Sequence, residues 1–160
     1  HARVGAEKAY RFLVSQGFPE PFAAHVRDCV RTHRFRSGDP PATIEAKILF
    51  DADKLDVTGA IGMARTFFYA AQVGQPLYTL LPDGTVSDGT AEEPKGCHSV
   101  LREYKFKLEK IYDRFLTPRG AEMARRRQAA MVSIYENILA EAREPYETGG
   151  SILRRCIEST

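Results

Sequence analysis

Apolar residues recur three or four positions apart along most of the chain, and this spacing is typical of amphipathic helices. By contrast, no segment alternates apolar and polar residues over the length that a strand needs. The predicted helices cover residues 1–16, 21–34, 44–68, 98–115 and 118–143, and a short helix is expected in the C-terminal tail. The pattern therefore predicts an all-α protein.

Glycine and proline mark the boundaries between these helices. Gly17 is expected to end the first helix, and Thr117-Pro118 is a typical helix start. Pro145 and Gly149-Gly150 are expected to end the helix that follows. Residues 74–96 contain several prolines and two Asp-Gly pairs, and we expect them to form a long loop or flap beside the site.

The stretch from Ile44 to Phe68 carries the most unusual polar pattern. Asp51, Asp53 and Asp56 fall within a predicted amphipathic helix, although Asp lowers helix propensity and is costly to bury without a partner. The apolar stripe of this helix is predicted to consist of Ile44, Ile48, Leu49, Ala52 and Leu55.

The helical repeat limits how many of these aspartates can share one site. At about 100° per residue, Asp51 and Asp53 point to nearly opposite sides, whereas Asp53 and Asp56 share a side that borders the stripe. We therefore expect Asp51 to lie in solvent or to cap a helix. The alternative is that all three are ordinary surface acids, with Lys54 as their counter-charge.

A histidine lies on the predicted buried face of the second helix. That face consists of Phe22, Val26, Cys29 and Val30, and His33 projects into its middle near the helix end. An inward histidine at this place is either a core residue bonded to the backbone or a ligand or catalytic group. Zinc ligation by His25, Cys29 and His33 is not favoured, because Cys packs most often as a small buried hydrophobe.

Composition narrows the classes of partner. The chain has 160 residues, of which 43% are hydrophobic, and this suits a single globular domain over residues 1–160. The net charge of +2 gives no strong electrostatic case for nucleic acid or a membrane. Arg125–Arg127 is either a solvated face or a contact for phosphate or nucleic acid. Three cysteines form no even framework, so a reduced, cytoplasmic location is expected.

Donors for a divalent metal occur on three of the predicted helices. His1, His33 and Asp53 offer imidazole and carboxylate groups, which borderline and hard divalent ions take as ligands. Helical bundles build such sites from side chains on facing helices. The ion itself is not distinguished among manganese, magnesium, iron, cobalt, nickel and zinc.

The run EAKILFDADKLDVTGAIGMAR, residues 45–65, resembles the last metal-binding helix of the HD-domain metal-dependent phosphohydrolases, in their small stand-alone bacterial branch. Two further runs are similar to the same branch, HARVGAEKA at residues 1–9 and EYKFKLEKIYDRFLTPRGAEMARRR at residues 103–127. The resemblance covers most of the chain. It implies an HD-domain helical bundle that binds one or two divalent ions.

The resemblance also implies roles for individual residues. Asp53 matches the final aspartate ligand of the family, and His1 and His33 match the histidines that line its site. Asp56 and Lys54 flank the ligand and are expected, with His33, to act in catalysis by binding substrate or water. Arg65 is expected to contact a substrate phosphate. The family's first His and its His-Asp pair would precede His1, so we expect N-terminal helices to be missing from this chain.

The function implied is metal-dependent hydrolysis of a phosphate ester or anhydride, and a nucleotide is the expected substrate. The partner is then a small phosphate compound or nucleotide, nucleic acid and membrane are not expected, and a homodimer is compatible with a helical protein of this size. The competing hypothesis is a non-catalytic helical binding module that has the HD fold with an incomplete metal site.

Overall fold

The computed structural model describes residues 2–34 and 39–158, and it is all-α, as predicted. Within the described residues, extended pairing is limited to one antiparallel bridge between Leu80 and Val86. The α-helices are α1 (Ala2–Ser15), α2 (Glu20–Thr32), α3 (Ile44–Leu55), α4 (Gly59–Gln72), α5 (Val100–Glu103) and α6 (Pro118–Glu158). The chain forms two compact units, His1–Asp56 with Asp113–Ala124, and Val57–Tyr112 with Arg125–Thr160.

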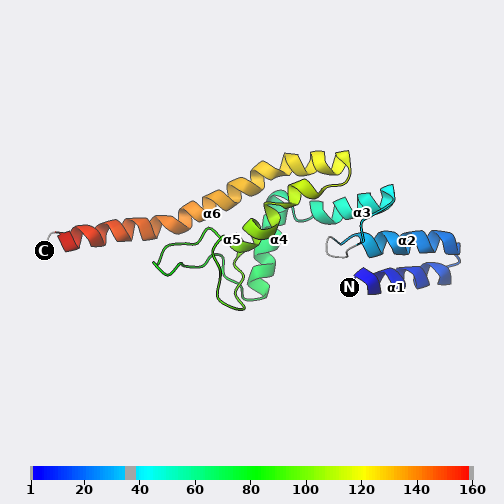
Figure 1. The fold of residues 1–160 in the computed structure, drawn as a ribbon, viewed down its shortest axis with the longest axis horizontal. Coiled ribbons are helices and arrows are strands. Elements are labelled where there is room, and N and C mark those ends of the chain that lie inside the picture. The colour runs from blue at the N-terminus through cyan, green and yellow to red at the C-terminus, as the bar shows by residue number, and fades with distance from the viewer. Residues whose placement is uncertain (1, 35–38, 159–160) are drawn as a thin grey trace. The chain divides into compact units, whose positions relative to one another are not determined.

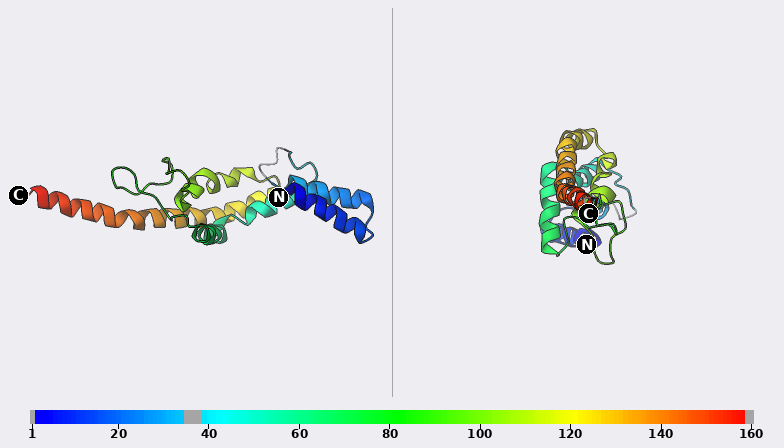
Figure 2. Two further views of the ribbon diagram at one scale, coloured as in Figure 1. Left: turned by 90° about the horizontal axis from the view of Figure 1, so that it is seen from below. Right: turned by 90° about the vertical axis from the view of Figure 1, so that its left-hand side faces the viewer.

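In the first unit, α1 and α2 pack side by side as a helical hairpin (Figure 1 and Figure 2). Small side chains permit this close approach, because Ala6 and Ala23 are 1% and 0% exposed. Gly17, at φ +81°, ends α1 in the left-handed conformation expected of a C-cap glycine. The guanidinium of Arg27 on α2 lies 5.2 Å from the ring centroid of Tyr10 on α1, a cation–π contact between the two helices.

The buried face of α2 agrees with the prediction at Val26, Cys29 and Val30 but not at Phe22, while that of α3 differs almost throughout. Phe22 of α2 is 48% exposed, while Thr32, beside Cys29, is buried. On α3 the predicted apolar stripe faces outward, since Ile44 and Ile48 are 57% and 55% exposed. The buried residues of α3 are Ala46, Phe50, Asp51 and Lys54. Periodicity identifies an amphipathic helix, but the partners available in the fold decide which side is covered.

The central stretch over residues 44–68 forms two helices, and the interruption falls at its glycines. Gly59 begins α4 with φ +68°, a backbone conformation that other residues rarely adopt. Gly62 lies against the backbone of Val57, where a Cβ atom would come 2.3 Å from the carbonyl carbon. The two glycines therefore allow the tight backbone approach over residues 57–62 with which α4 begins.

The second unit has its own hydrophobic core. Its buried members are Met63, Ala70, Val100, Leu101, Tyr104, Leu108, Met131 and Tyr135. The rings of Tyr104 and Tyr135 stack with centroids 4.0 Å apart. Tyr104 begins a π-helix (Tyr104–Leu108), in which Glu109 N–H donates to the Tyr104 carbonyl at 2.8 Å. The helix predicted over residues 98–115 is therefore α5 followed by this π-helix and a 3₁₀ helix (Ile111–Arg114).

The predicted loop over residues 74–96 contains no helix, and hydrogen bonds hold it to other parts of the second unit. Tyr135 O–H donates to the carbonyl of Asp88 at 2.8 Å, and Arg143 donates to the carbonyl of Val86 at 3.2 Å. Glu93 accepts the backbone N–H of Ser99 at 2.7 Å.

The predicted end of the long helix at Pro145 is wrong. α6 is continuous to Glu158, with Pro145 inside it (Figure 2). A proline removes one backbone donor and crowds the preceding turn, but the other hydrogen bonds of the helix can persist around it.

Candidate functional site

The last two turns of α3 place three charged residues in three different environments. Asp51 is 2% exposed, although the sequence allowed it to lie in solvent. Its carboxylate accepts the N–H groups of Leu116 and Thr117, both at 2.8 Å, and the Thr117 hydroxyl at 2.6 Å. The predicted capping role is confirmed, because these bonds hold the residues that begin α6. Thr117 in turn accepts the N–H of Gly120 at 3.0 Å.

Asp53 points away from that anchor, with its side chain 52% exposed. One carboxylate oxygen lies 3.6 Å from the ammonium of Lys54. The carboxylate is thus restrained on one side and open to solvent on the other. This is an environment in which it could bind a cation.

Lys54 is almost fully buried, with 6% of its side chain exposed. Its ammonium lies 3.5 Å from the ring centroid of Phe50 and donates to the carbonyl of His33 at 3.4 Å. Burial lowers the pKa of this ammonium, and the charges of Asp53 and Asp51 act in the opposite direction.

His33 is the C-cap of α2 and is half-buried. Its Nδ1 bonds to the carbonyl of Val30, which can only accept, so Nδ1 carries the proton. In the neutral ring, Nε2 is then left with a lone pair. A backbone carbonyl on the other ring nitrogen is a common companion of metal-binding histidines.

The structure brings together three of the predicted site residues. The Lys54 ammonium contacts both the His33 carbonyl and the Asp53 carboxylate, so the C-terminal ends of α2 and α3 adjoin. Asp56 is the exposed C-cap of α3, directly beyond them. Arg65 is exposed on α4, in the second unit. His1 lies outside the described residues.

The donor set fits a divalent metal ion in kind. A half-exposed carboxylate and an imidazole whose Nδ1 is bonded to a backbone carbonyl are ligands that such ions take. In number the set is small: across residues 2–34 and 39–158, no three His, Cys, Asp or Glu side chains lie together as a metal site. On α2, the Nε2 atom of His25 lies 3.5 Å from Glu45 Oε2 and 3.8 Å from Cys29 Sγ. The ring of His33 bonds instead to the carbonyl of Val30.

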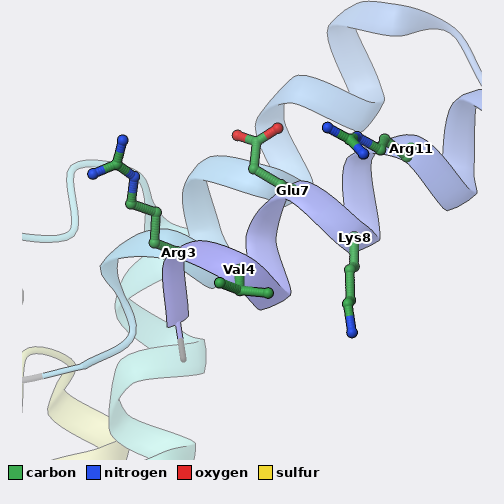
Figure 3. A pocket seen from close by; sticks show the side chains of 5 residues that line it. All are labelled: Arg3, Val4, Glu7, Lys8 and Arg11. Carbon is green, nitrogen blue, oxygen red and sulfur yellow. The ribbon is translucent and has the colours of Figure 1, made fainter.

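A surface pocket lies elsewhere in the first unit, on α1 (Figure 3). It is lined by Arg3, Val4, Glu7, Lys8 and Arg11, all from one helix, and none of the predicted site residues that the structure describes is among them. None of the helices in the part of the chain that the structure describes has the length and apolar character needed to cross a membrane.

Sequence reasoning missed the residues that anchor α6 to α3. Gly120 is pressed against Asp51, where a Cβ atom would come 2.4 Å from the carboxylate Oδ2. The signal available in the sequence was the Thr117-Pro118 helix start, whose unpaired N–H groups require an acceptor. Nothing in the sequence showed that the acceptor would be Asp51.

In sequence, the chain is similar to a protein of Bacillus subtilis. No protein-family profile matches the chain. The uncharacterized protein YpgQ of Bacillus subtilis is 35% identical over 80 residues, which cover 48% of this chain and 39% of YpgQ.

Solved structures resemble the chain over more of its length. The crystal structure of YpgQ matches with a TM-score of 0.66 and 27% identity, covering 85% of this chain and 63% of that one. A Bacillus thuringiensis HD-superfamily hydrolase matches with a TM-score of 0.61 and 28% identity, covering 86% of this chain and 62% of that one. YpgQ in complex with ADP matches with a TM-score of 0.66 and 26% identity, covering 85% and 61%. The chain spans less than two thirds of the length of each.

These similarities confirm the class inferred from residues 45–65, since the chain has the all-α fold of small stand-alone bacterial HD-like proteins. Within that class it resembles YpgQ of Bacillus subtilis in both sequence and structure.

Proposed function

We propose that this chain is part of a metal-dependent phosphohydrolase that acts on a phosphate ester or anhydride of a nucleotide. The observation that carries the proposal is the fold shared with an HD-superfamily hydrolase at 28% identity. The half-exposed Asp53 and the imidazole of His33, at adjoining helix ends, supply donors of the right kind. Support for the nucleotide comes from the complex of YpgQ with ADP.

The residues at the helix ends have distinct roles in this proposal. Asp53 and His33 hold a divalent ion, together with His1 and with ligands from the rest of the full-length protein. A bound ion would supply Lewis-acid polarisation of a phosphoryl oxygen. Asp56 is placed at the exposed end of α3, where it can orient water or substrate. The contact of Arg65 with a substrate phosphate stays a prediction from the resemblance.

The test is nucleotide hydrolysis by the full-length protein with added Mn²⁺. Nucleoside mono-, di- and triphosphates are screened for release of phosphate or pyrophosphate, and the best substrate is used for Asp53→Asn. We expect kcat/KM to fall about 100-fold or more, because a metal ion contributes several kcal/mol of transition-state stabilisation. The matched control is Asp28→Asn, whose side chain on α2 is equally exposed, at 52%. This variant should retain the activity.

Two outcomes would contradict the proposal. Equal activity in Asp53→Asn and the wild type would show that Asp53 has no role in the reaction. Nucleotide binding with neither metal binding nor hydrolysis would favour the competing hypothesis of a non-catalytic module.

A further inference from the structure

We propose that Lys54 is a positioning residue of the metal site, which restrains Asp53 and the end of α2 from within the protein and does not contact substrate. This inference rests on the proposed function. It assigns Lys54 a role different from the binding of substrate or water that the family resemblance implies.

Burial is the first reason. Only 6% of the Lys54 side chain is exposed, against 52% for its neighbour Asp53. The ammonium lies over the face of Phe50, with the ring centroid 3.5 Å away. A substrate phosphate approaching from solvent would meet Asp53 before it met this group. Reaching phosphate would require Lys54 to give up the cation–π contact and its bond to the His33 carbonyl.

The contacts of the ammonium are the second reason. It lies 3.6 Å from Asp53 Oδ2 and donates to the His33 carbonyl at 3.4 Å. That carbonyl is among the last of α2, where the helix leaves acceptors unpaired and where a cation is favourable. One buried charge therefore restrains the side chain of one proposed ligand and the backbone of the other.

The backbone of His33 also determines where its ring lies. The Nδ1 bond to Val30 fixes the ring relative to the last turn of α2. The Lys54 bond fixes that turn relative to α3. Partners that orient metal ligands in this way typically change metal affinity by about 10- to 100-fold when they are lost.

The test is the affinity of the full-length protein for Mn²⁺ alone, measured by competition with a chelator, alongside the Tm without metal. Lys54→Met keeps the aliphatic packing on Phe50 and removes the charge. We expect the Kd for Mn²⁺ to rise about 10- to 100-fold. The Tm should stay constant or rise, because a buried ammonium is removed and Asp53 is already solvated.

Two further variants make the test specific. Lys54→Arg restores a cation at the same place and should recover most of the affinity. Lys47→Met removes a half-buried lysine from the same helix and should leave the Kd unchanged. If Lys54→Met does not fold, Lys54→Gln replaces it, since the amide can donate to the His33 carbonyl but carries no charge.

The outcomes separate this inference from the proposed function. A wild type that binds Mn²⁺ and a folded Lys54→Met of equal affinity would overturn the positioning role alone, as would tighter binding by the variant. A lower Tm with unchanged affinity would make Lys54 a purely structural residue. A full-length wild type that does not bind Mn²⁺ would overturn the proposed function, and the inference with it.

Discussion

Asp51 and Asp53 are two residues apart in the chain, yet their surroundings differ completely. Asp51 is 2% exposed and accepts three hydrogen bonds, while half of the Asp53 side chain is in solvent. The helical repeat correctly predicted that they point to opposite sides, and of its two alternatives for Asp51, solvent or a helix cap, the structure shows the second. It did not show that the Asp51 side is the buried one, because that depends on the start of α6, some 65 residues further on.

Replacement of Asp51 should destabilise the protein far more than replacement of Asp53. In Asp51→Asn, an amide N–H₂ faces backbone donors of Leu116 or Thr117, and at least one buried donor loses its acceptor. We expect the free energy of unfolding to fall by about 2–4 kcal/mol. In Asp53→Asn it should fall by only about 1 kcal/mol or less, because the pair that is lost joins Lys54 to a half-exposed, solvated carboxylate. Urea denaturation of both variants without metal gives the comparison. Equal stabilities would mean that Asp51 does not anchor α6.

Gly120 provides a second test of this anchor. Gly to Ala within a helix normally stabilises by about 1 kcal/mol. At Gly120 the added Cβ atom would come 2.4 Å from Asp51 Oδ2 and displace the carboxylate from its bonds. We therefore expect Gly120→Ala to lower the free energy of unfolding by about 2 kcal/mol, reflecting the loss of those bonds.

The control for this substitution lies in the same helix. Gly149 of α6 has nothing within 4 Å of an added Cβ atom, so Gly149→Ala should show the ordinary stabilisation. Stabilisation by both substitutions in thermal or urea unfolding would refute the close packing at Asp51.

At the scale of elements, local signals predicted helix starts better than helix ends. Thr117-Pro118 begins α6 as expected, since Thr supplies the cap and Pro needs no donor at the first position. Pro145 did not end that helix, and Gly59 divided the central stretch into α3 and α4. No local pattern in the sequence predicts the π-helix that begins at Tyr104. It occurs where Tyr104 stacks on Tyr135 of α6, a contact between residues far apart in the chain.

Tyr135 links α6 to both the π-helix and the loop, and its titration makes this link measurable. Burial, helped by the charge of Asp88, raises the pKa of Tyr135 to about 12. A folded pKa above the unfolded value of about 10 gives stability that is complete below pH 10 and is lost as the pH rises towards 12.

The variant Tyr135→Phe tests this sign. At pH 8 it should be less stable than the wild type by about 1 kcal/mol, since the Asp88 carbonyl loses its donor. Between pH 9 and pH 11 the difference should shrink, because only the wild type can ionise at this position. Urea denaturation at each pH is the measurement, and a difference that stays constant or grows would contradict the assignment.

At the scale of the whole molecule, the sequence predicted the all-α class and the resemblance to HD proteins. Both rest on features that can be recognised without knowing how the helices pack, namely the helical spacing of apolar residues and the run over residues 45–65. The buried faces were harder to predict, because Ile44 and Ile48 follow a clean helical period yet lie outward, and Lys54 lies inward. The single domain over residues 1–160, the cytoplasmic location and the homodimer stay predictions.

The most direct measurement is the metal content of the purified full-length protein by elemental analysis, for the wild type and for Asp53→Ala. We expect near-stoichiometric transition metal in the wild type, and loss of the metal in Asp53→Ala without loss of the folded state. Asp28→Ala, which removes an equally exposed carboxylate, should retain the metal. A folded wild type without metal, even after incubation with Mn²⁺, or an Asp53→Ala variant with undiminished metal, would contradict the central claim.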